Sequence, residues 1–396
     1  MQDKLPHTKH FSSILKLLIV CCQSDPTEEE IVFIRDTLPT IDSTLLATLA
    51  NKHCVFPLVH KSLHTYPHAK CPLSHKVLST FKSYYMKISQ HNMLMSAELI
   101  QIIQLLATHN IKALAFKGPA LSQMAYGDIT LRQFGDLDIL IQKKDRSKMM
   151  DLLLQKQYVP EINLKKETKE TFFNCVNVIG LHKESTGILV EIHWELLSKN
   201  YAIDWEEKSL WDTQANTKIN QKNIPILSTE QHLLYLCAHG SKHLFERLEW
   251  ICDIDRCIRA NKDLDWELIL SEAEKLGIKR MLYLGLVLSQ QFFRTNLPES
   301  IQEEITQDKK IPKLISKIIK LNFSKDTQAS KNYSTFGLLW SMRESFPDQL
   351  RFAWRGMFAP KFDDFKYIQL PSHLSFLYPL VRPFRLMTKY FKSQGQ

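Results

Sequence analysis

Three acidic residues are the side chains of this sequence best suited to chemistry. Asp136 and Asp138 lie two positions apart in FGDLDILIQ, and Glu191 lies in ILVEIHWE. Both segments have the apolar composition of strands, and side chains at i and i+2 of a strand point the same way. We therefore expect the two aspartates to face one spot, where a third carboxylate from a neighbouring strand completes a set of oxygen ligands for Mg²⁺. Two such ions, about 3.5–4 Å apart, suit the transfer of phosphorus-containing groups.

Two aspartates in a strand are a weak signal by themselves, because such residues are as often solvated as bound to a metal. Here the neighbours Leu137 and Ile139 predict burial, and like charges at a buried edge repel one another unless a cation compensates them. An upstream apolar run, KALAF, is followed closely by Gly118, which predicts a tight turn directly after a strand. These features favour a cation site over a solvated pair.

The elements that must position these carboxylates form a mixed block between two helical regions. Apolar residues at three- and four-residue intervals predict helices over 11–110, including a long one over 76–110, and again from Ser228 to about 322. The block between them is predicted to contain strands at 112–116, 136–142, 172–184 and 187–196, and a helix at 146–157 capped by Asp145. The expected fold class is α+β, a small mixed β-sheet core flanked by N-terminal and C-terminal helical regions.

The chain length of 396 residues predicts more than one core. We expect an N-terminal helical region over 1–110, a catalytic core over 111–227, a C-terminal helical domain over 228–334 and a basic aromatic tail over 335–396. Residues 322–334 are polar and read as a loop, and prolines divide the tail into short pieces.

The cysteine pattern indicates a reducing compartment, and the net charge permits two interpretations. The net charge of +9 fits an anionic partner, although helical proteins without such a partner are often as basic. The eight cysteines contain no C-x-x-C pair, and no window approaches 18 uncharged apolar residues. The short apolar run at 14–22 is interrupted by Lys16 and reads as an opening helix, not a signal peptide. We expect a cytoplasmic protein.

The motifs LAFKGPAL, LRQFGDLDILI and VEIHWEL together resemble the nucleotidyltransferase superfamily that includes DNA polymerase beta. Within it, the chain is most similar to a bacterial family of uncharacterised nucleotidyltransferases, and HLLYLCAHGSKH resembles that family's helical half. The resemblance extends from about residue 12 to 390, with the specific residues confined to 112–195.

This resemblance implies a role for each matching residue. Asp136 and Asp138 would bind two Mg²⁺ (or Mn²⁺) ions, and Glu191 would be the third metal ligand, beside the incoming hydroxyl group. Gly118 would open the turn to the triphosphate of an NTP substrate. In-line attack on the α-phosphorus would then depend on positioning and charge neutralisation.

The sequence departs from the superfamily at Pro119, where Gly or Ser is usual. Proline has neither an N–H group nor a hydroxyl group, so one phosphate donor is missing. Lys117 or Ser122 could substitute for it. Arg132 could neutralise phosphate or form a structural pair with an aspartate.

The sequence does not decide between the possible roles of three histidines. His193 shares the strand face of Glu191 and could orient that carboxylate, contact substrate or be structural. His239 and His243 are one helical turn apart, a spacing that permits zinc, contact with an acceptor substrate or a structural polar cluster.

The expected function is Mg²⁺-dependent transfer of a nucleoside monophosphate to an unidentified acceptor: a small molecule, a glycan precursor or a protein. Nucleic acid is possible as a partner but not favoured. One alternative is a catalytically inert protein that binds nucleotide or RNA on the same scaffold. Another is a module that contacts a membrane surface through the tail, whose aromatic residues could instead pack against the body.

Overall fold

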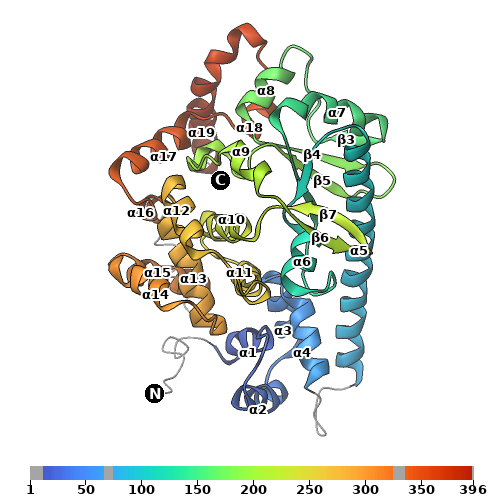
Figure 1. Ribbon diagram of the computed structural model, residues 1–396, viewed down its shortest axis with the longest axis vertical. Coiled ribbons are helices and arrows are strands. Elements are labelled where there is room, and N and C mark those ends of the chain that lie inside the picture. The colour runs from blue at the N-terminus through green and yellow to red at the C-terminus, as the bar shows by residue number, and fades with distance from the viewer. Residues whose placement is uncertain (1–11, 67–74, 324–334, 395–396) are drawn as a thin grey trace.

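A five-stranded sheet carries the acidic residues. The computed structural model describes residues 12–66, 75–323 and 335–394, and the sheet lies at the upper right of Figure 1. Its strands are β1 (Ala113–Ala115), β2 (Asp136–Ile141), β3 (Tyr158–Pro160), β4 (Val178–Lys183) and β5 (Leu189–His193), in the order β1-β2-β5-β4-β3. Strands β2 and β5 are parallel, and the other neighbours are antiparallel. The sheet is therefore mixed, and the α+β class is confirmed.

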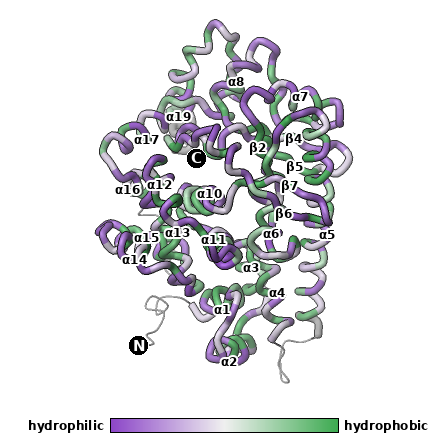
Figure 2. The backbone as a smooth tube through the Cα atoms, viewed as in Figure 1, coloured by the Kyte–Doolittle hydropathy of each residue, from purple (hydrophilic) through white to green (hydrophobic). Residues whose placement is uncertain are grey.

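The two faces of the sheet have different neighbours. Leu137, Ile139 and Ile192 belong to an apolar cluster that also contains Leu99 and Ile102 of the long helix α5 (His75–Thr108). Helix α5 runs along the right edge of Figure 1, and the strands β2, β4 and β5 are largely hydrophobic in Figure 2. Because side chains alternate along a strand, the acidic residues of β2 and β5 face the other way.

Helices surround the sheet on the remaining sides. The N-terminal group, at the bottom of Figure 1, comprises α1 (Ser13–Cys21), α2 (Glu28–Thr37), α3 (Ser43–Lys52) and α4 (Phe56–Thr65). Around the sheet lie α6 (Gly118–Tyr126), α7 (Arg146–Gln155), α8 (Lys169–Cys175) and α9 (Glu207–Asp212). The C-terminal group comprises α10 (Thr229–Lys242), α11 (Leu248–Ala260), α12 (Trp266–Leu276), α13 (Lys279–Phe293), α14 (Glu299–Gln307) and α15 (Ile311–Phe323). The tail forms α16 (Thr335–Ser341), α17 (Phe346–Phe358), α18 (Phe362–Tyr367) and α19 (Tyr378–Gln394).

A capping hydrogen bond explains the start of α10 but not the start of α7. The Ser228 hydroxyl group accepts a hydrogen bond from the Gln231 N–H group, which starts α10 where the sequence predicts it. Asp145 precedes α7 as expected, but its side chain makes no capping hydrogen bond. The four-part division of the chain stays a prediction, and the expected loop at 322–334 lies, from residue 324 on, outside the described residues.

The strand predicted at 172–184 is wrong in its first part. Residues Lys169–Cys175 form α8, and strand β4 begins only at Val178. Phe172 and Phe173 are adjacent yet both buried, and both rings contact Trp194. A strand would direct these two rings to opposite faces, so packing around Trp194 favours the helix.

The hairpin of β6 (Ala215–Ile219) and β7 (Lys222–Ile226) was not predicted. Its two turn residues, Asn220 and Gln221, both have positive φ, as a two-residue turn of this type requires, but neither is glycine. In the tail, α19 continues through Pro383, so the prediction that prolines cut this segment into short pieces is wrong there. Within the described residues, no helix combines the length and apolarity needed to cross a bilayer.

Candidate active site

Asp138 and Glu191 are register partners on the parallel strands β2 and β5. Their side chains therefore lie side by side on one face, and His193, two residues further along β5, joins them. The His193 Nε2 atom is 3.2 Å from Asp138 Oδ1 and 3.3 Å from Glu191 Oε2. One ligand atom from each of the three residues lies within 4.8 Å of the others, so the three could hold a metal ion together.

Asp136 lies beside this group and outside it. It occupies the same strand face as Asp138, two positions away, and its carboxylate is not part of the three-residue cluster. Burial and then the charge of Asp138 raise the pKa of Asp136 to about 6. The raised pKa shows that a positive charge next to Asp136 would stabilise its ionised form.

Lys117 supplies the positive charge nearest to Asp138. Its Nζ atom is 3.1 Å from Asp138 Oδ1. Burial alone would lower the pKa of Lys117, but Asp138 and Tyr235 outweigh burial and the pKa is raised. Burial likewise opposes ionisation of Asp138, yet Lys117 and His193 hold its pKa well below the usual range. Asp138 is thus a buried carboxylate that stays charged.

Gly118 is required by the close approach of two backbone segments. It has a φ of +53°, and a Cβ atom placed on it would lie 3.1 Å from the Asp136 carbonyl oxygen. Helix α6 starts here, with Lys117 at the N-cap and Pro119 in the first turn. The start of α6 therefore lies directly against the first residue of β2.

Two of the expected phosphate-binding residues have partners within the fold. Arg132 donates to Asp253 of α11 through Nε at 2.9 Å and Nη2 at 3.0 Å, and it lies 3.1 Å from Glu249. Arg132 thus forms the structural pair with an aspartate, while its role in neutralising phosphate stays a prediction. The Ser122 hydroxyl group is buried and donates to the Asp128 carbonyl at 2.9 Å, so it closes the loop after α6.

A cavity of about 510 Å³ opens beside Asp136 and Lys117. Its far wall comes from α10 and α11 and contains His239, His243 and Trp250. The ring centroids of His243 and Trp250 are 4.9 Å apart, and those of His239 and His243 are also 4.9 Å apart. The two histidines therefore line the same cavity as Asp136, and their predicted contact with an acceptor substrate stays a prediction.

The two histidines are neutral at physiological pH. Burial and then Lys117 hold the pKa of His239 well below its usual value, and burial with Lys242 lowers the pKa of His243 to about 4. The nearby Asp253 is paired with Arg132, and Asp255 accepts from Arg259 and Thr295. Within the described part of the chain, the possible metal-binding cluster does not include His239 or His243.

Two lysines beside Tyr201 were not identified from the sequence, and one of them, Lys242, lies near the acidic group. Lys242 of α10 and Lys361 before α18 both place their ammonium groups over the Tyr201 ring, at 5.2 and 5.9 Å from its centroid. Burial, then Lys117 and Lys361, lower the pKa of Lys242 to about 8, while Glu191 and Asp138 oppose the shift. The spacing of Lys242 three residues after His239 was visible in the sequence, but only the fold brings it near Lys117.

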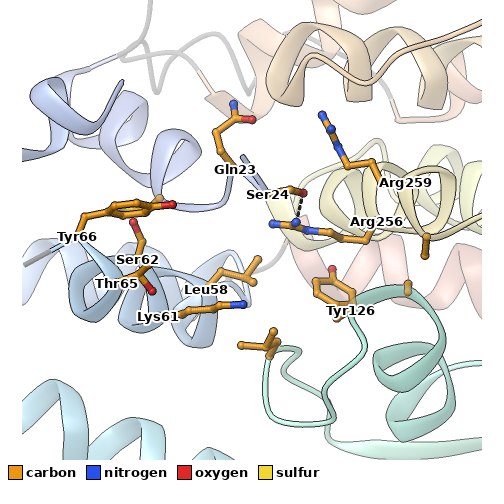
Figure 3. Close-up of a pocket in the computed structure, with 14 residues that line it drawn as sticks. Gln23, Ser24, Leu58, Lys61, Ser62, Thr65, Tyr66, Tyr126, Arg256 and Arg259 are labelled. Atoms are coloured by element: carbon orange, nitrogen blue, oxygen red, sulfur yellow. Dashed lines mark hydrogen bonds between the residues drawn. The ribbon is translucent and has the colours of Figure 1, made fainter. Parts of the chain in front are cut away.

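A second cavity, of about 310 Å³, lies at the other end of α11 (Figure 3). Arg256 and Arg259 line it, together with Ser24 and Tyr126. The Arg256 guanidinium group donates to Ser24 and to the Cys22 carbonyl, and Arg259 donates to Asp255 and to the Phe293 carbonyl. These arginines join α11 to α1 and α13, so the first cavity, beside the carboxylates, is the candidate active site.

Three solved structures are similar to part of the chain. The lincosamide antibiotic adenylyltransferase LnuA, lincomycin-bound, is 17% identical over 42% of this chain and 97% of its own, with a TM-score of 0.31. The antibiotic-resistance factor ANT(2'')-Ia is 10% identical over 47% and 90%, with a TM-score of 0.33. An antigenic nucleotidyltransferase-like protein from Paracoccidioides brasiliensis is 16% identical over 53% and 94%, with a TM-score of 0.31.

No curated protein sequence matches the chain. The family model described as "Uncharacterised nucleotidyltransferase" matches residues 39–294, a span that contains β1, β2, β5 and both cavity-lining helices, α10 and α11. The chain therefore belongs to this family of uncharacterised nucleotidyltransferases.

Proposed function

We propose that this nucleotidyltransferase moves a nucleoside monophosphate from an NTP to an acceptor held in the cavity beside Asp136, with the help of Mg²⁺ or Mn²⁺. The observation that supports the proposal most is the register of β2 and β5, which pairs Asp138 with Glu191 and places Asp136 on the same face. The acceptor could be a small molecule, a glycan precursor or a protein.

The residues present fit a divalent cation. Asp138 Oδ2 is buried and has no hydrogen-bond partner in the described part of the chain. Carboxylate oxygens are the preferred ligands of Mg²⁺, and Asp136, Asp138 and Glu191 would supply them. His193 of β5, which contacts both carboxylates, would hold Glu191 and Asp138 in place. A bound ion supplies neutralisation of the triphosphate charge and polarisation of the α-phosphate.

Cations and a helix start would bind the triphosphate. Lys117 and Lys242 place two ammonium groups near the acidic cluster, and Lys117 lies within 3.1 Å of Asp138. The first turn of α6 also directs backbone N–H groups toward the site, and such a helix start favours phosphate. These lysines compensate for the donor that Pro119 cannot provide.

The transfer itself exchanges one bond to phosphorus for another. An oxygen or nitrogen of the acceptor forms a bond to the α-phosphorus, and the bond from that phosphorus to the bridging oxygen of pyrophosphate breaks. The acceptor proton leaves to water or to a carboxylate of the site, and pyrophosphate departs. Lys117 and Lys242 would stabilise the negative charge that develops on the leaving group.

Labelling would test turnover and reveal the acceptor together. The protein is incubated with α-labelled NTP, Mg²⁺ and cell extract, and labelled products are separated. We expect label transfer by the native protein and by Asp151→Asn, a matched change on the exposed surface of α7, but not by Asp136→Ala/Asp138→Ala. Label that persists in the double variant would contradict the proposal.

A thermal-shift measurement separates an inert binding protein from an enzyme. Mg²⁺ with NTP should raise the melting temperature, and Asp138→Asn should abolish that shift while Asp151→Asn retains it. A retained shift without any labelled product would support the inert alternative. We also place the protein in the cytoplasm, where NTP and Mg²⁺ are available.

A further inference from the structure

Two helices of the tail expose regular apolar stripes. On α17 the stripe consists of Phe346, Leu350, Trp354 and Met357, which are 65%, 50%, 67% and 47% exposed. On the turn before α19 and on α19 itself it consists of Phe376, Leu380, Phe384 and Met387, which are 70%, 63%, 59% and 58% exposed. Both sets follow the spacing i, i+4, i+8, i+11, which places side chains on one face of a helix.

These exposed side chains are concentrated in one region. The described residues include 21 large hydrophobic side chains that are exposed, and 12 of them lie between Phe336 and Met387. Single exposed apolar residues are ordinary, whereas a contiguous exposed patch marks an interaction surface. The concentration in the tail therefore indicates a surface that binds something.

The stripes remain exposed although both helices are firmly packed. The Arg382 guanidinium group of α19 donates twice to the Gly356 carbonyl of α17, at 3.0 and 2.8 Å. Arg385 donates to the buried Asp364 at 2.6 Å, and Phe352 of α17 is buried. Each helix thus buries one face against the protein and presents its other apolar side chains to solvent. The surface is part of the fold, at the upper left of Figure 1.

The tail has an excess of basic residues, although Arg351, Arg355 and Arg385 pair with Asp348, Asp204 and Asp364. Residues 335–396 contain nine Lys and Arg residues and four Asp and Glu residues, an excess of five, whereas the whole chain carries +9. More than half of the net charge thus lies in the last 62 residues. Helices with an apolar face, aromatic residues and an excess of basic residues lie in the plane of a bilayer surface, where anionic lipids attract them.

We propose that the stripes of α17 and α19 dock this protein on a bilayer surface that contains anionic phospholipid. Trp354 and the phenylalanine rings would enter the headgroup region, where amphipathic aromatic side chains are favoured. The helices would lie on the bilayer without crossing it. The surface is independent of the carboxylate site, although Lys361 belongs to the same tail and lies near Lys242 over the Tyr201 ring.

Vesicle co-sedimentation of the full chain tests the proposal. Vesicles of phosphatidylcholine alone are compared with vesicles that also contain phosphatidylglycerol, at low and high salt. We expect binding to the anionic vesicles, and we expect salt to weaken it. Trp354→Gln/Phe384→Gln removes one ring from each stripe and should reduce the partition coefficient about tenfold or more. The matched control, Met93→Gln/Leu94→Gln, changes two side chains of α5 that are 56% and 64% exposed and should bind normally.

Two kinds of result would overturn membrane docking, and they can be told apart. Absence of binding to anionic vesicles, or equal loss in both double variants, would overturn the proposal. A dimer that light scattering detects and that Trp354→Gln/Phe384→Gln dissociates, without vesicle binding, would identify a second copy of the chain as the occupant. Circular dichroism melting of each variant verifies folding, because every substituted side chain is exposed. The labelling reaction in solution is expected to survive in Trp354→Gln/Phe384→Gln, which separates this surface from the active site.

Discussion

The ammonium group of Lys117 lies 3.1 Å from Asp138, a carboxylate with no measurable side-chain exposure. Lys117 is the N-cap residue of α6, and Asp138 lies in the middle of β2, so the contact joins the turn to the strand. A lysine in this position compensates a buried negative charge. In the proposed reaction Lys117 would also bind phosphate, because a bound cation would then compensate the charge of Asp138.

Replacing Lys117 by Met should destabilise the metal-free protein by about 3–5 kcal/mol, because a buried carboxylate loses its partner. Mg²⁺ should restore a large part of the loss, since a bound cation would supply the missing charge. Melting with and without Mg²⁺ measures both effects. Lys112→Met, at an exposed position before β1, provides the control. An equal loss with and without Mg²⁺ would show that no cation binds next to Asp138.

Replacing Gly118 by Ala should destabilise the protein by about 1–2 kcal/mol through its positive φ alone. It should also disturb Asp136, whose carbonyl oxygen would lie 3.1 Å from the new methyl group. Urea unfolding measures the loss, and the label transfer should fall as well. The control is Gly356→Ala in α17, where a Cβ atom meets nothing within 4 Å and should be neutral or slightly stabilising. Equal behaviour of the two variants would refute the requirement for glycine at 118.

Replacing Arg132 by Met should cost about 3–5 kcal/mol, because Asp253 is completely buried and would lose its bidentate partner. The double variant Arg132→Met/Asp253→Leu should recover part of that loss, since position 253 no longer carries an unpaired charge. The recovery should be incomplete, because Glu249, 3.1 Å from Arg132, also loses its partner. Chemical denaturation of the native protein, Arg132→Met, Asp253→Leu and the double variant gives the coupling free energy between the two positions. Arg351→Met, which breaks an exposed pair with Asp348, should cost about 0–1 kcal/mol. A small, additive effect at Arg132 would point back to phosphate binding as its role.

Nucleotide affinity should fall as the pH rises from 7 to 9. The pKa of Lys242 is lowered to about 8 by burial and by Lys117 and Lys361, so the ammonium group loses its proton within this range. Only the protonated form attracts a triphosphate, and the dissociation constant should increase about tenfold. Calorimetric titration with a non-hydrolysable NTP analogue provides the measurement.

Two variants decide whether Lys242 causes this pH dependence. Lys242→Arg keeps the charge throughout the range and should bind with little change between pH 7 and 9. Lys242→Met should bind weakly at every pH. An unchanged pH profile in Lys242→Met would assign the titration to another group.

The central part of the fold could be predicted from the sequence because its signals are local. Strand periodicity around Asp136 and Asp138 indicated β2, and the apolar neighbours of Glu191 indicated β5. The side chain of each strand residue alternates, so the face of the carboxylates followed from the spacing alone. Their register had to come from the structure.

Other features depend on partners far away in the chain. Arg132 and Asp253 are 121 positions apart, so the sequence could not distinguish an ion pair from a phosphate contact. Lys242 comes near Lys117 only through the fold, in which Tyr235 and His232 of α10 contact Phe116 directly after β1. The helix α8 forms because Phe172 and Phe173 both pack near Trp194. The β6–β7 hairpin was missed because its turn contains no glycine, the usual sequence signal for such a turn.

The large cavity is assembled from separate stretches of chain: Cys54, the segment from Lys117 to Asp136, and the segment from His239 to Trp250. A fragment that ended at residue 227 would retain every carboxylate of the candidate metal site and lose the cavity wall formed by α10 and α11. Such a fragment could keep the capacity to bind cations while having no place to seat a second reactant. In the proposed reaction, recognition of the acceptor and the chemistry at phosphorus would therefore depend on different parts of the polypeptide, which the Arg132–Asp253 pair joins.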